Sequence, residues 1–188
     1  MPSVRSLAAA TALLSLCGAA AASAAQIEGV HFQPTIRVGE DVLDLNGYAL
    51  LRYKVLFKGY VAALYLPPTA KPEQVLTKMP KRLEIEYFWD ISAEDFAVAT
   101  VDGIAANVSS GQLRTLQPAI GEFNALYKDV KPGDRYALSY DPDSGTELSL
   151  NGNALGVVAG DEFAAAIFAI WLGENPLDAG LKAALLGM

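Results

Sequence analysis

The sequence has few of the side chains on which most hydrolytic and metal-dependent sites are built. It contains one cysteine, Cys17, and one histidine, His31. A site with several histidine ligands is therefore excluded. We also exclude Ser-His-Asp and Cys-His triads by inventory, because His31 is the one histidine and Cys17 lies in a segment that we expect to be removed. His31 itself lies in a strand-like segment and is expected to be a surface or packing residue. No metal ion and no cofactor is expected.

Basic side chains are also scarce, with 14 Lys and Arg against 21 Asp and Glu. The one basic cluster is the segment 78–82, Lys-Met-Pro-Lys-Arg, so nucleic acid and anionic lipid surfaces are not expected partners. Gly133, Gly145 and Gly152 fall in hairpin-like turns and not between a strand and a helix. The sequence therefore gives no support for a phosphate-binding loop.

The first 25 residues have the layout of a cleavable secretory signal. Arg5 precedes an apolar run, residues 7–16, and an alanine-rich stretch ends at Ala25. The apolar run is shorter than the ~20 residues that span a bilayer, so a signal is favoured over a membrane anchor. A lipoprotein signal at Cys17 is disfavoured by the bulky residue before it. Cleavage after Ala25 would leave residues 26–188 periplasmic or secreted, with no thiol and 13 basic against 21 acidic side chains, hence a net charge of −8.

Residues 26–188 suffice for one domain with a substantial core. Apolar alternation and turn signals predict an edge strand or short hairpin at 27–38 and a short strand at 42–45 that ends in an Asn46-Gly47 turn. Two central strands are expected within 50–66, with a tight connection at Lys58-Gly59. The remaining strands are expected at 82–89, with one buried and one mostly wet face, and at 136–141, 146–151 and 155–158.

Helical periodicity predicts a layer of helices that packs on this sheet, so the fold class is α+β. A helix with a capping-box-like start is expected from 92 to 107. The next pattern, after residue 109, contains Pro118, which marks either a kink or a break between two helices. The remaining helices are expected at 71–79, 162–172 and 177–186. Of these, 162–172 is apolar on nearly every side, so it must be well buried or lie under a ligand.

Arg52 is the cation that we expect to point inward, because it lies within the apolar run of the two central strands. Its guanidinium is costly to bury unless an acid pairs with it. A protein carboxylate would make Arg52 a structural ion pair, whereas a ligand carboxylate or enolate would make it a ligand-binding residue. Tyr60, across the expected connection, is placed to donate its hydroxyl to the same oxygen.

Five segments occur in an order that is typical of one family. They are Leu45-Asn46-Gly47 with Arg52 and Phe-Lys-Gly-Tyr-Val-Ala-Ala-Leu-Tyr-Leu at 57–66; Asp-Ile-Ser-Ala-Glu-Asp at 90–95; Val-Lys-Pro-Gly-Asp at 130–134; Gly-Thr-Glu-Leu at 145–148 with Asn151-Gly152; and 163–178, which contains Ile-Trp-Leu-Gly-Glu-Asn-Pro. Together they span the chain after the signal. This set resembles the chalcone isomerase superfamily, specifically its secreted bacterial chalcone isomerase-like branch.

The resemblance implies an open-faced β-sandwich, a large antiparallel sheet with helices on one face and an apolar ligand cleft between them. Plant chalcone isomerases close a flavanone ring with an Arg at the attacking phenolate and with Thr, Tyr and Asn side chains around the ketone. Only the Arg carries over, as Arg52. The resemblance places Tyr60 at the position of the catalytic Thr and Phe96 near that of the Tyr. It places Gly103 near the Asn and Ile170 near a polar residue late in the chain. The segment before Arg52 is one residue longer than the usual bacterial turn.

Three functions remain open. Related non-catalytic plant members bind fatty acids with an Arg and a Tyr, which implies a periplasmic protein that binds a small apolar carboxylate such as a fatty acid. Arg52 and Tyr60 would hold the head group, and the candidate lining residues are Phe57, Phe96, Phe163, Ile167 and Trp171. One alternative is a chalcone isomerase-type intramolecular lyase or isomerase that uses Arg52, although no general acid or base is apparent. The other is a ligand-free accessory protein whose cleft is filled by side chains.

Overall fold

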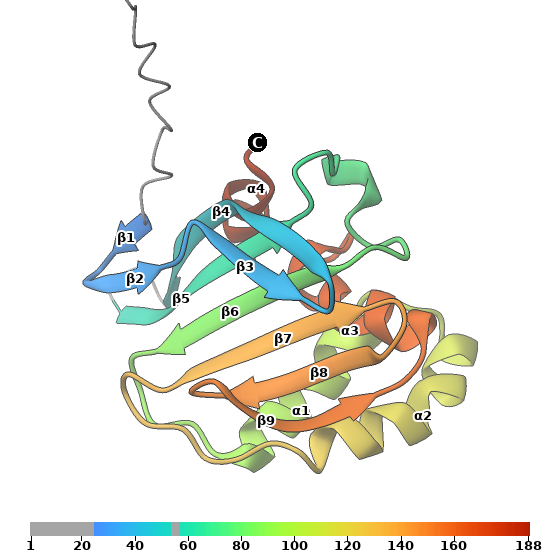
Figure 1. Ribbon diagram of the computed structural model, residues 1–188. Coiled ribbons are helices and arrows are strands. Elements are labelled where there is room, and N and C mark those ends of the chain that lie inside the picture. The colour runs from blue at the N-terminus through green and yellow to red at the C-terminus, as the bar shows by residue number, and fades with distance from the viewer. Residues whose placement is uncertain (1–24, 54–56) are drawn as a thin grey trace, which may run out of the picture.

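The computed structural model describes residues 25–53 and 57–188 (Figure 1). The expected signal, except for Ala25, lies outside the described residues, and so does the segment 54–56 between the two central strands. Ala25 itself is the first residue of a strand, in which it pairs with Phe32 of the next strand. No helix among the described residues is long and apolar enough to cross a membrane.

One large sheet organises the molecule. Its seven strands are all antiparallel and lie in the order in which they occur along the chain. They are β3 (Thr35–Val38), β4 (Asp41–Tyr53), β5 (Phe57–Leu66), β6 (Lys81–Tyr87), β7 (Arg135–Asp141), β8 (Gly145–Leu150) and β9 (Asn153–Val158). A separate hairpin, β1 (Ala25–Ile27) and β2 (Val30–Phe32), precedes them. The final meander, β7 to β9, is as predicted.

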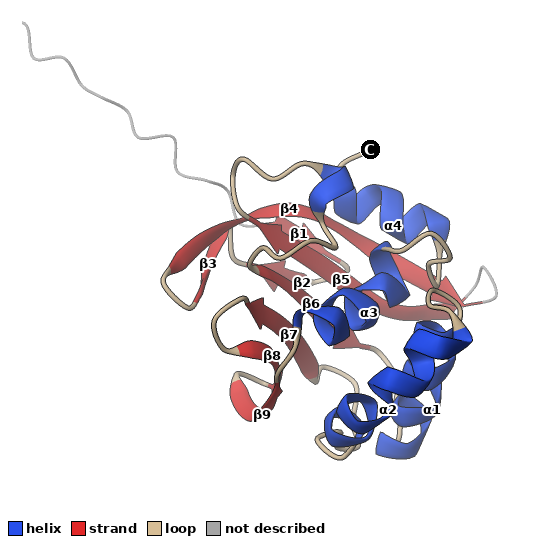
Figure 2. Ribbon diagram, turned by 90° about the vertical axis from the view of Figure 1, so that its right-hand side faces the viewer, coloured by secondary structure: helices blue, strands red, loops and turns tan. Residues whose placement is uncertain are grey.

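The helices gather on one face of the sheet (Figure 2). They are α1 (Ala93–Ala105), α2 (Ser110–Asn124), α3 (Asp161–Leu172) and α4 (Ala179–Leu186), with a short 3-10 helix, η1 (Pro72–Gln74), where a longer helix was expected. The predicted capping box of α1 is present, since the Ser92 side chain accepts from the Asp95 N–H and the Asp95 carboxylate accepts from the Ser92 N–H. Pro118 lies inside α2, which is one helix. The α+β fold with a helical layer on one face is confirmed.

The predicted turn at Asn46-Gly47 is wrong, because β4 continues through it. Asn46 is an extra residue that the pairing with β5 skips, which makes it a β-bulge. Its side-chain Nδ2 donates to the Leu185 carbonyl at 2.7 Å. A Cβ atom on Gly47 would lie 2.2 Å from the Ala184 carbonyl oxygen. The glycine is therefore required by the close approach of α4 and not by a turn.

The predicted connection at Lys58-Gly59 is also wrong, since both residues lie within β5. Leu51 pairs with Tyr60 and Arg52 pairs with Lys58, so Gly59 is a second bulge. Two irregularities in register, one in each strand and near opposite ends of their pairing, therefore decide which side chains of this hairpin face the helices.

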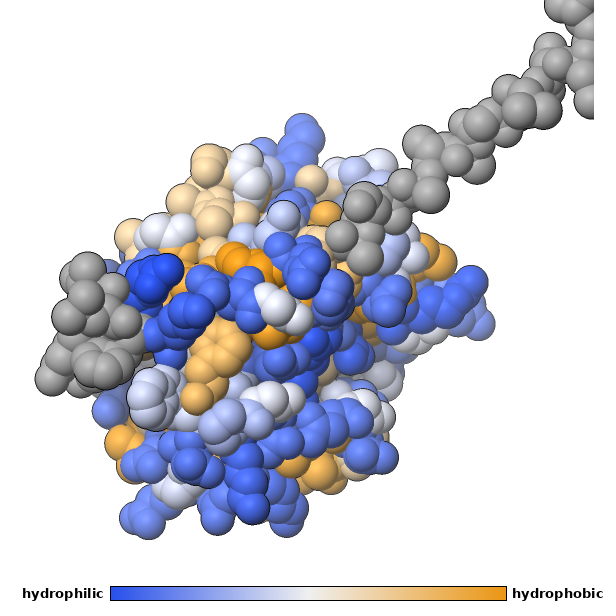
Figure 3. Space-filling view, turned by 90° about the vertical axis from the view of Figure 1, so that its left-hand side faces the viewer, coloured by the Kyte–Doolittle hydropathy of each residue, from blue (hydrophilic) through white to orange (hydrophobic). Residues whose placement is uncertain are grey.

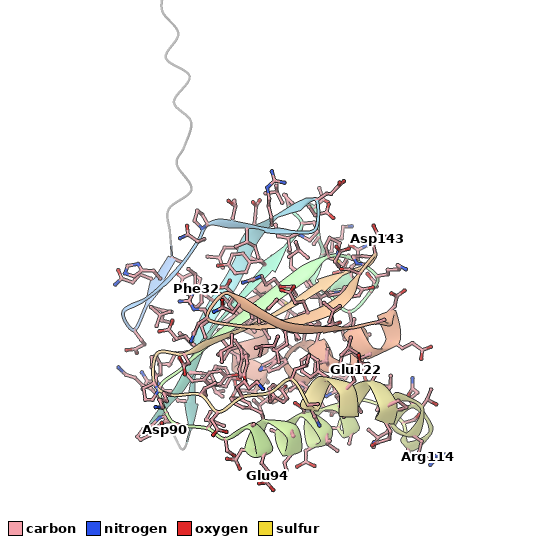
Figure 4. The ribbon with its side chains drawn as sticks, turned by 60° about the horizontal axis from the view of Figure 1, so that its bottom comes forward. Phe32, Asp90, Glu94, Arg114, Glu122 and Asp143 are labelled. Atoms are coloured by element: carbon pink, nitrogen blue, oxygen red, sulfur yellow. The ribbon has the colours of Figure 1, made fainter. Side chains whose placement is uncertain are left out.

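Both faces of the sheet are covered. The larger apolar cluster lies between the sheet and the helices, and a smaller one lies under the β1–β2 hairpin, where Phe32, Leu43 and Tyr65 are fully buried. Figure 4 shows Phe32 turned toward the sheet, whereas Glu94 lies on the side of α1 that faces away from it.

The alternation predicted that the second face of β6 is mostly exposed to solvent. This face instead carries a partly buried ion-pair network. Glu84 accepts from Arg82 and from Arg135, each at 3.0 Å, and Arg135 also binds Glu86 at 2.7 Å. The Phe32 ring lies 4.7 Å from the Arg135 guanidinium. These charges can be partly buried because each carboxylate binds at least one planar arginine guanidinium.

Candidate ligand cavity

A small cavity lies between the sheet and α3. Its volume is about 20 Å³, which corresponds to roughly one water molecule. No lining side chain carries a charge. Besides aliphatic residues of the sheet, the walls are formed by Tyr87, Phe123, Tyr127, Tyr136, Ile167 and Trp171.

Tyrosine hydroxyls supply the polar groups around this cavity. The Tyr127 hydroxyl lies 2.8 Å from the Thr100 hydroxyl, and the Tyr136 hydroxyl donates to the Lys128 carbonyl at 2.8 Å. The Tyr87 hydroxyl has no hydrogen-bond partner among the described side chains and backbone groups, although Tyr87 is only 5% exposed. Burial raises the pKa of Tyr87 and of Tyr127 well above the ordinary tyrosine range. The cavity therefore offers neutral O–H donors, one of which is free.

Tyr60, predicted at the head group, and Trp171, predicted in the lining, are joined directly. The Trp171 Nε1–H donates to the Tyr60 hydroxyl oxygen at 3.0 Å and so links β5 to α3. Burial also raises the pKa of Tyr60 far above its ordinary value, so this hydroxyl stays protonated. Ile167, one turn before Trp171 on α3, lines the cavity with it.

Phe96 and Phe163 lie behind the cavity walls. The Phe96 ring is 5.2 Å from the rings of both Tyr87 and Tyr127, and the Phe163 ring is 5.4 Å from that of Phe123. These two predicted lining residues therefore fix the positions of the walls. The side chain of Phe57 lies outside the described part of the structure.

Arg52 does not point inward, which corrects the prediction. Its side chain is 49% exposed, and its Nη2 lies 3.7 Å from Glu28 at the tip of the β1–β2 hairpin, where Lys58 binds the same carboxylate. Hydrophilic residues cover most of the face on which this hairpin lies (Figure 3). Arg52 and Tyr60 are therefore not brought together at one head-group site.

The bulge at Asn46 explains the direction of Arg52. Before the bulge, Leu43 and Leu45 belong to the cluster under the hairpin, whereas after it Ala49 and Leu51 pack against the cluster under the helices. One extra residue shifts the alternation of side chains by one, so every later residue changes face. Arg52 follows Leu51 and consequently faces away from the helices.

Gly103 and Ile170, which the family resemblance assigns to the Asn and the late polar position, touch each other. A Cβ atom on Gly103 would lie 2.9 Å from the Ile170 side chain, which is 6% exposed. α1 and α3 are therefore in close apolar contact at this point.

Sequence reasoning missed the tyrosine cluster of Tyr87, Tyr127 and Tyr136. The alternation at 82–89 predicted that Tyr87 is buried, and the helical pattern after residue 109 placed Tyr127 on its apolar side, although α2 itself ends at Asn124. Neither pattern shows where a hydroxyl points. Among the described residues, no group of three or more His, Cys, Asp or Glu side chains is arranged to hold a metal ion.

The family model for chalcone isomerase-like proteins matches residues 24–187. The chain belongs to the chalcone isomerase-like family. The fold is similar to the crystal structure of a fatty-acid binding protein from Arabidopsis thaliana, with a TM-score of 0.66 and 13% identity over 87% of this chain and 96% of that one. No curated protein sequence matches the chain. The family resemblance read from the sequence is thereby confirmed, although its bacterial, secreted branch is not tested.

Proposed function

We propose that this protein is a non-catalytic member of its family that binds a small apolar carboxylate, such as a fatty acid, in the periplasm. The observation that carries this proposal is Tyr87, which lines an uncharged and largely aromatic cavity and whose hydroxyl has no hydrogen-bond partner among the described residues. The fully buried unpaired side-chain atoms of the described residues belong to Tyr65, Asn124 and Thr146 and not to Tyr87, so the Tyr87 hydroxyl is still accessible to an oxygen atom of a ligand. The fatty-acid binding protein of similar fold supports the ligand class.

The head group would then bind to neutral hydroxyls and not to Arg52. Tyr87 supplies the free donor, and Tyr127 lies beside it on the cavity wall. Ligand cavities usually measure about 300–1,000 Å³, far more than the cavity here. An alkyl chain therefore requires side chains to move, and the hydrogen bond between Trp171 and Tyr60 is the contact that must open.

The first 25 residues support this location, since a charged start, an apolar run and small residues are typical of a secretory signal. The signal, the periplasmic location and the bacterial branch are part of this proposal. The net charge of residues 26–188 is negative, which suits a protein that stays free of anionic lipid surfaces.

A ligand-free accessory protein is the second candidate, and the small volume of the cavity favours it. No observation favours an isomerase of the chalcone type, because Arg52 lies on the other face of the sheet from the cavity.

The test is native mass spectrometry of the protein purified from its secreted compartment, followed by organic extraction. We expect the wild type to carry a carboxylic acid. Tyr87→Phe should reduce its occupancy at limiting ligand about 5- to 10-fold, the value of one hydrogen bond, and Arg52→Ala should leave it unchanged. A wild type that is empty and takes up no added fatty acid would overturn the proposal and favour the accessory role. Loss of ligand in Arg52→Ala alone would overturn the assignment of the head group.

A further inference from the structure

A second and much larger concavity lies beside the C-terminal end of α3. It is a groove of about 430 Å³ between the η1 segment, the end of α3 and α4. Figure 1 shows the β5–β6 connection, which contains η1, at the same end of the molecule as α4. This volume lies within the usual range of small-molecule sites, which is about 300–1,000 Å³.

The floor of this groove is part of the core. Val75 and Leu172 are each 3% exposed and Leu186 is 5% exposed, while Leu76 forms a partly exposed wall. Buried side chains hold their positions because moving them costs packing energy. In contrast to the cavity under α3, the groove therefore exists without rearrangement.

A single cation faces this apolar surface. Lys182 lines the groove, and its Nζ donates to the Gly173 carbonyl at 2.8 Å, at the end of α3. Among the described residues it forms no ion pair, so two of its three N–H groups are left for a ligand. Glu73 and Glu174 also line the groove and are exposed. Their charges oppose a ligand with two negative charges more than a ligand with one.

We propose that the groove is a binding site for an amphipathic monoanion, a molecule with an apolar chain and one carboxylate. The chain would lie on Val75, Leu76, Leu172 and Leu186, and the carboxylate would pair with Lys182. The site stands on its own residues and does not rest on the function proposed for the cavity.

The probe is decanoate, titrated into the ¹⁵N-labelled protein and followed by NMR, with 1-decanol as a ligand of the same chain length without charge. Amide shifts are expected at Leu76, Gly173 and Lys182. Lys182→Gln should weaken decanoate binding about 10-fold, the value of a charged hydrogen bond. It should leave decanol binding unchanged, and the exposed control Lys131→Gln should change neither.

Leu76→Glu provides an independent variant that leaves Lys182 in place. A third negative charge, beside those of Glu73 and Glu174, should abolish decanoate binding without unfolding the protein, because Leu76 is partly exposed. Equal decanoate affinity in Lys182→Gln and the wild type would overturn the proposal, and so would the absence of binding at millimolar decanoate. Shifts confined to Tyr87, Tyr127 and Trp171, lost in Tyr87→Phe, would assign the ligand to the cavity alone.

Discussion

At the scale of single residues, Lys81 is a buried cation that has no carboxylate in direct contact among the residues that the structure describes. It is 1% exposed, and its Nζ donates to the Thr77 carbonyl at 3.0 Å and to the Met79 carbonyl at 2.8 Å. The Tyr140 ring lies 4.3 Å below the same nitrogen. Burial lowers the pKa of Lys81 to about 8, although Asp161 nearby opposes the shift. Through these two hydrogen bonds, Lys81 holds in place the segment that follows the groove residues Val75 and Leu76.

This burial makes stability depend on pH. Between pH 8 and 9.5 the unfolded chain largely keeps the Lys81 proton and the folded chain loses it, so Lys81 should add ~1.5 kcal/mol to the free energy of unfolding. The buried tyrosines act in the opposite sense, because tyrosines of the unfolded chain, with a pKa of about 10, are already partly ionised at pH 9.5. The difference between the wild type and Lys81→Met therefore isolates the Lys81 contribution. Urea unfolding of the wild type and of Lys81→Met at several pH values checks this. The rise should be absent in the variant, and an equal rise in both proteins would assign it to another group.

At the scale of elements, the contact between α1 and α3 is set by a glycine inside a helix. Gly103 costs α1 helix propensity, but its missing Cβ lets Ile170 of α3 approach. Gly121, in α2, is the natural comparison, because a Cβ atom there would meet no atom within 4 Å. The same substitution should therefore have opposite effects in the two helices.

Gly121→Ala should raise the free energy of unfolding by about 0.5–1 kcal/mol, the difference in helix propensity. Gly103→Ala should instead lower it, because overpacking costs about 1–3 kcal/mol and exceeds that gain. Denaturant unfolding of both variants measures the difference. If Gly103→Ala were as stabilising as Gly121→Ala, α1 and α3 would not be in tight contact, and the cleft would be more open than described.

At the scale of the whole molecule, the sheet has apolar contacts on both faces, and the second face depends on the β1–β2 hairpin. Phe32 covers Arg135, and the Arg135 Nη2 donates to the His31 carbonyl at 3.1 Å. Glu28, at the hairpin tip, has φ of +53°, a conformation that costs about 1 kcal/mol or more for a residue other than glycine. Its ion pairs with Arg52 and Lys58 help to offset that cost.

Phe32→Ala should therefore destabilise the whole fold, although Phe32 belongs to a two-stranded sheet outside the main one. A fully buried phenylalanine is worth about 3–5 kcal/mol when truncated to alanine. Val42→Ala is the control: Val42 lies in β4 and is 46% exposed, so it should change stability by less than ~0.5 kcal/mol. Thermal unfolding followed by circular dichroism compares them. Similar melting temperatures for the two variants would mean that the hairpin is not part of the cooperative unit.

Local chemistry determined much of this protein directly from the sequence. The capping box at Ser92, the apolar helix 162–172 and the β7–β9 meander depend on neighbouring residues, so their patterns predicted them within a few positions. The ordered family segments predicted the sheet with its helical layer. Within the candidate site, Ile167 and Trp171 were found because an all-apolar helix must be buried.

Only the tertiary structure decided which way the polar side chains point. Asn46-Gly47 has the composition of a turn, but the backbone of α4 passes against it, and the strand continues with one extra residue. That single bulge turns Arg52 away from the helices. The cluster of Tyr87, Tyr127 and Tyr136 joins β6 to β7 and to the segment that follows α2, and no pattern of period 2 or 3.6 records where such segments meet.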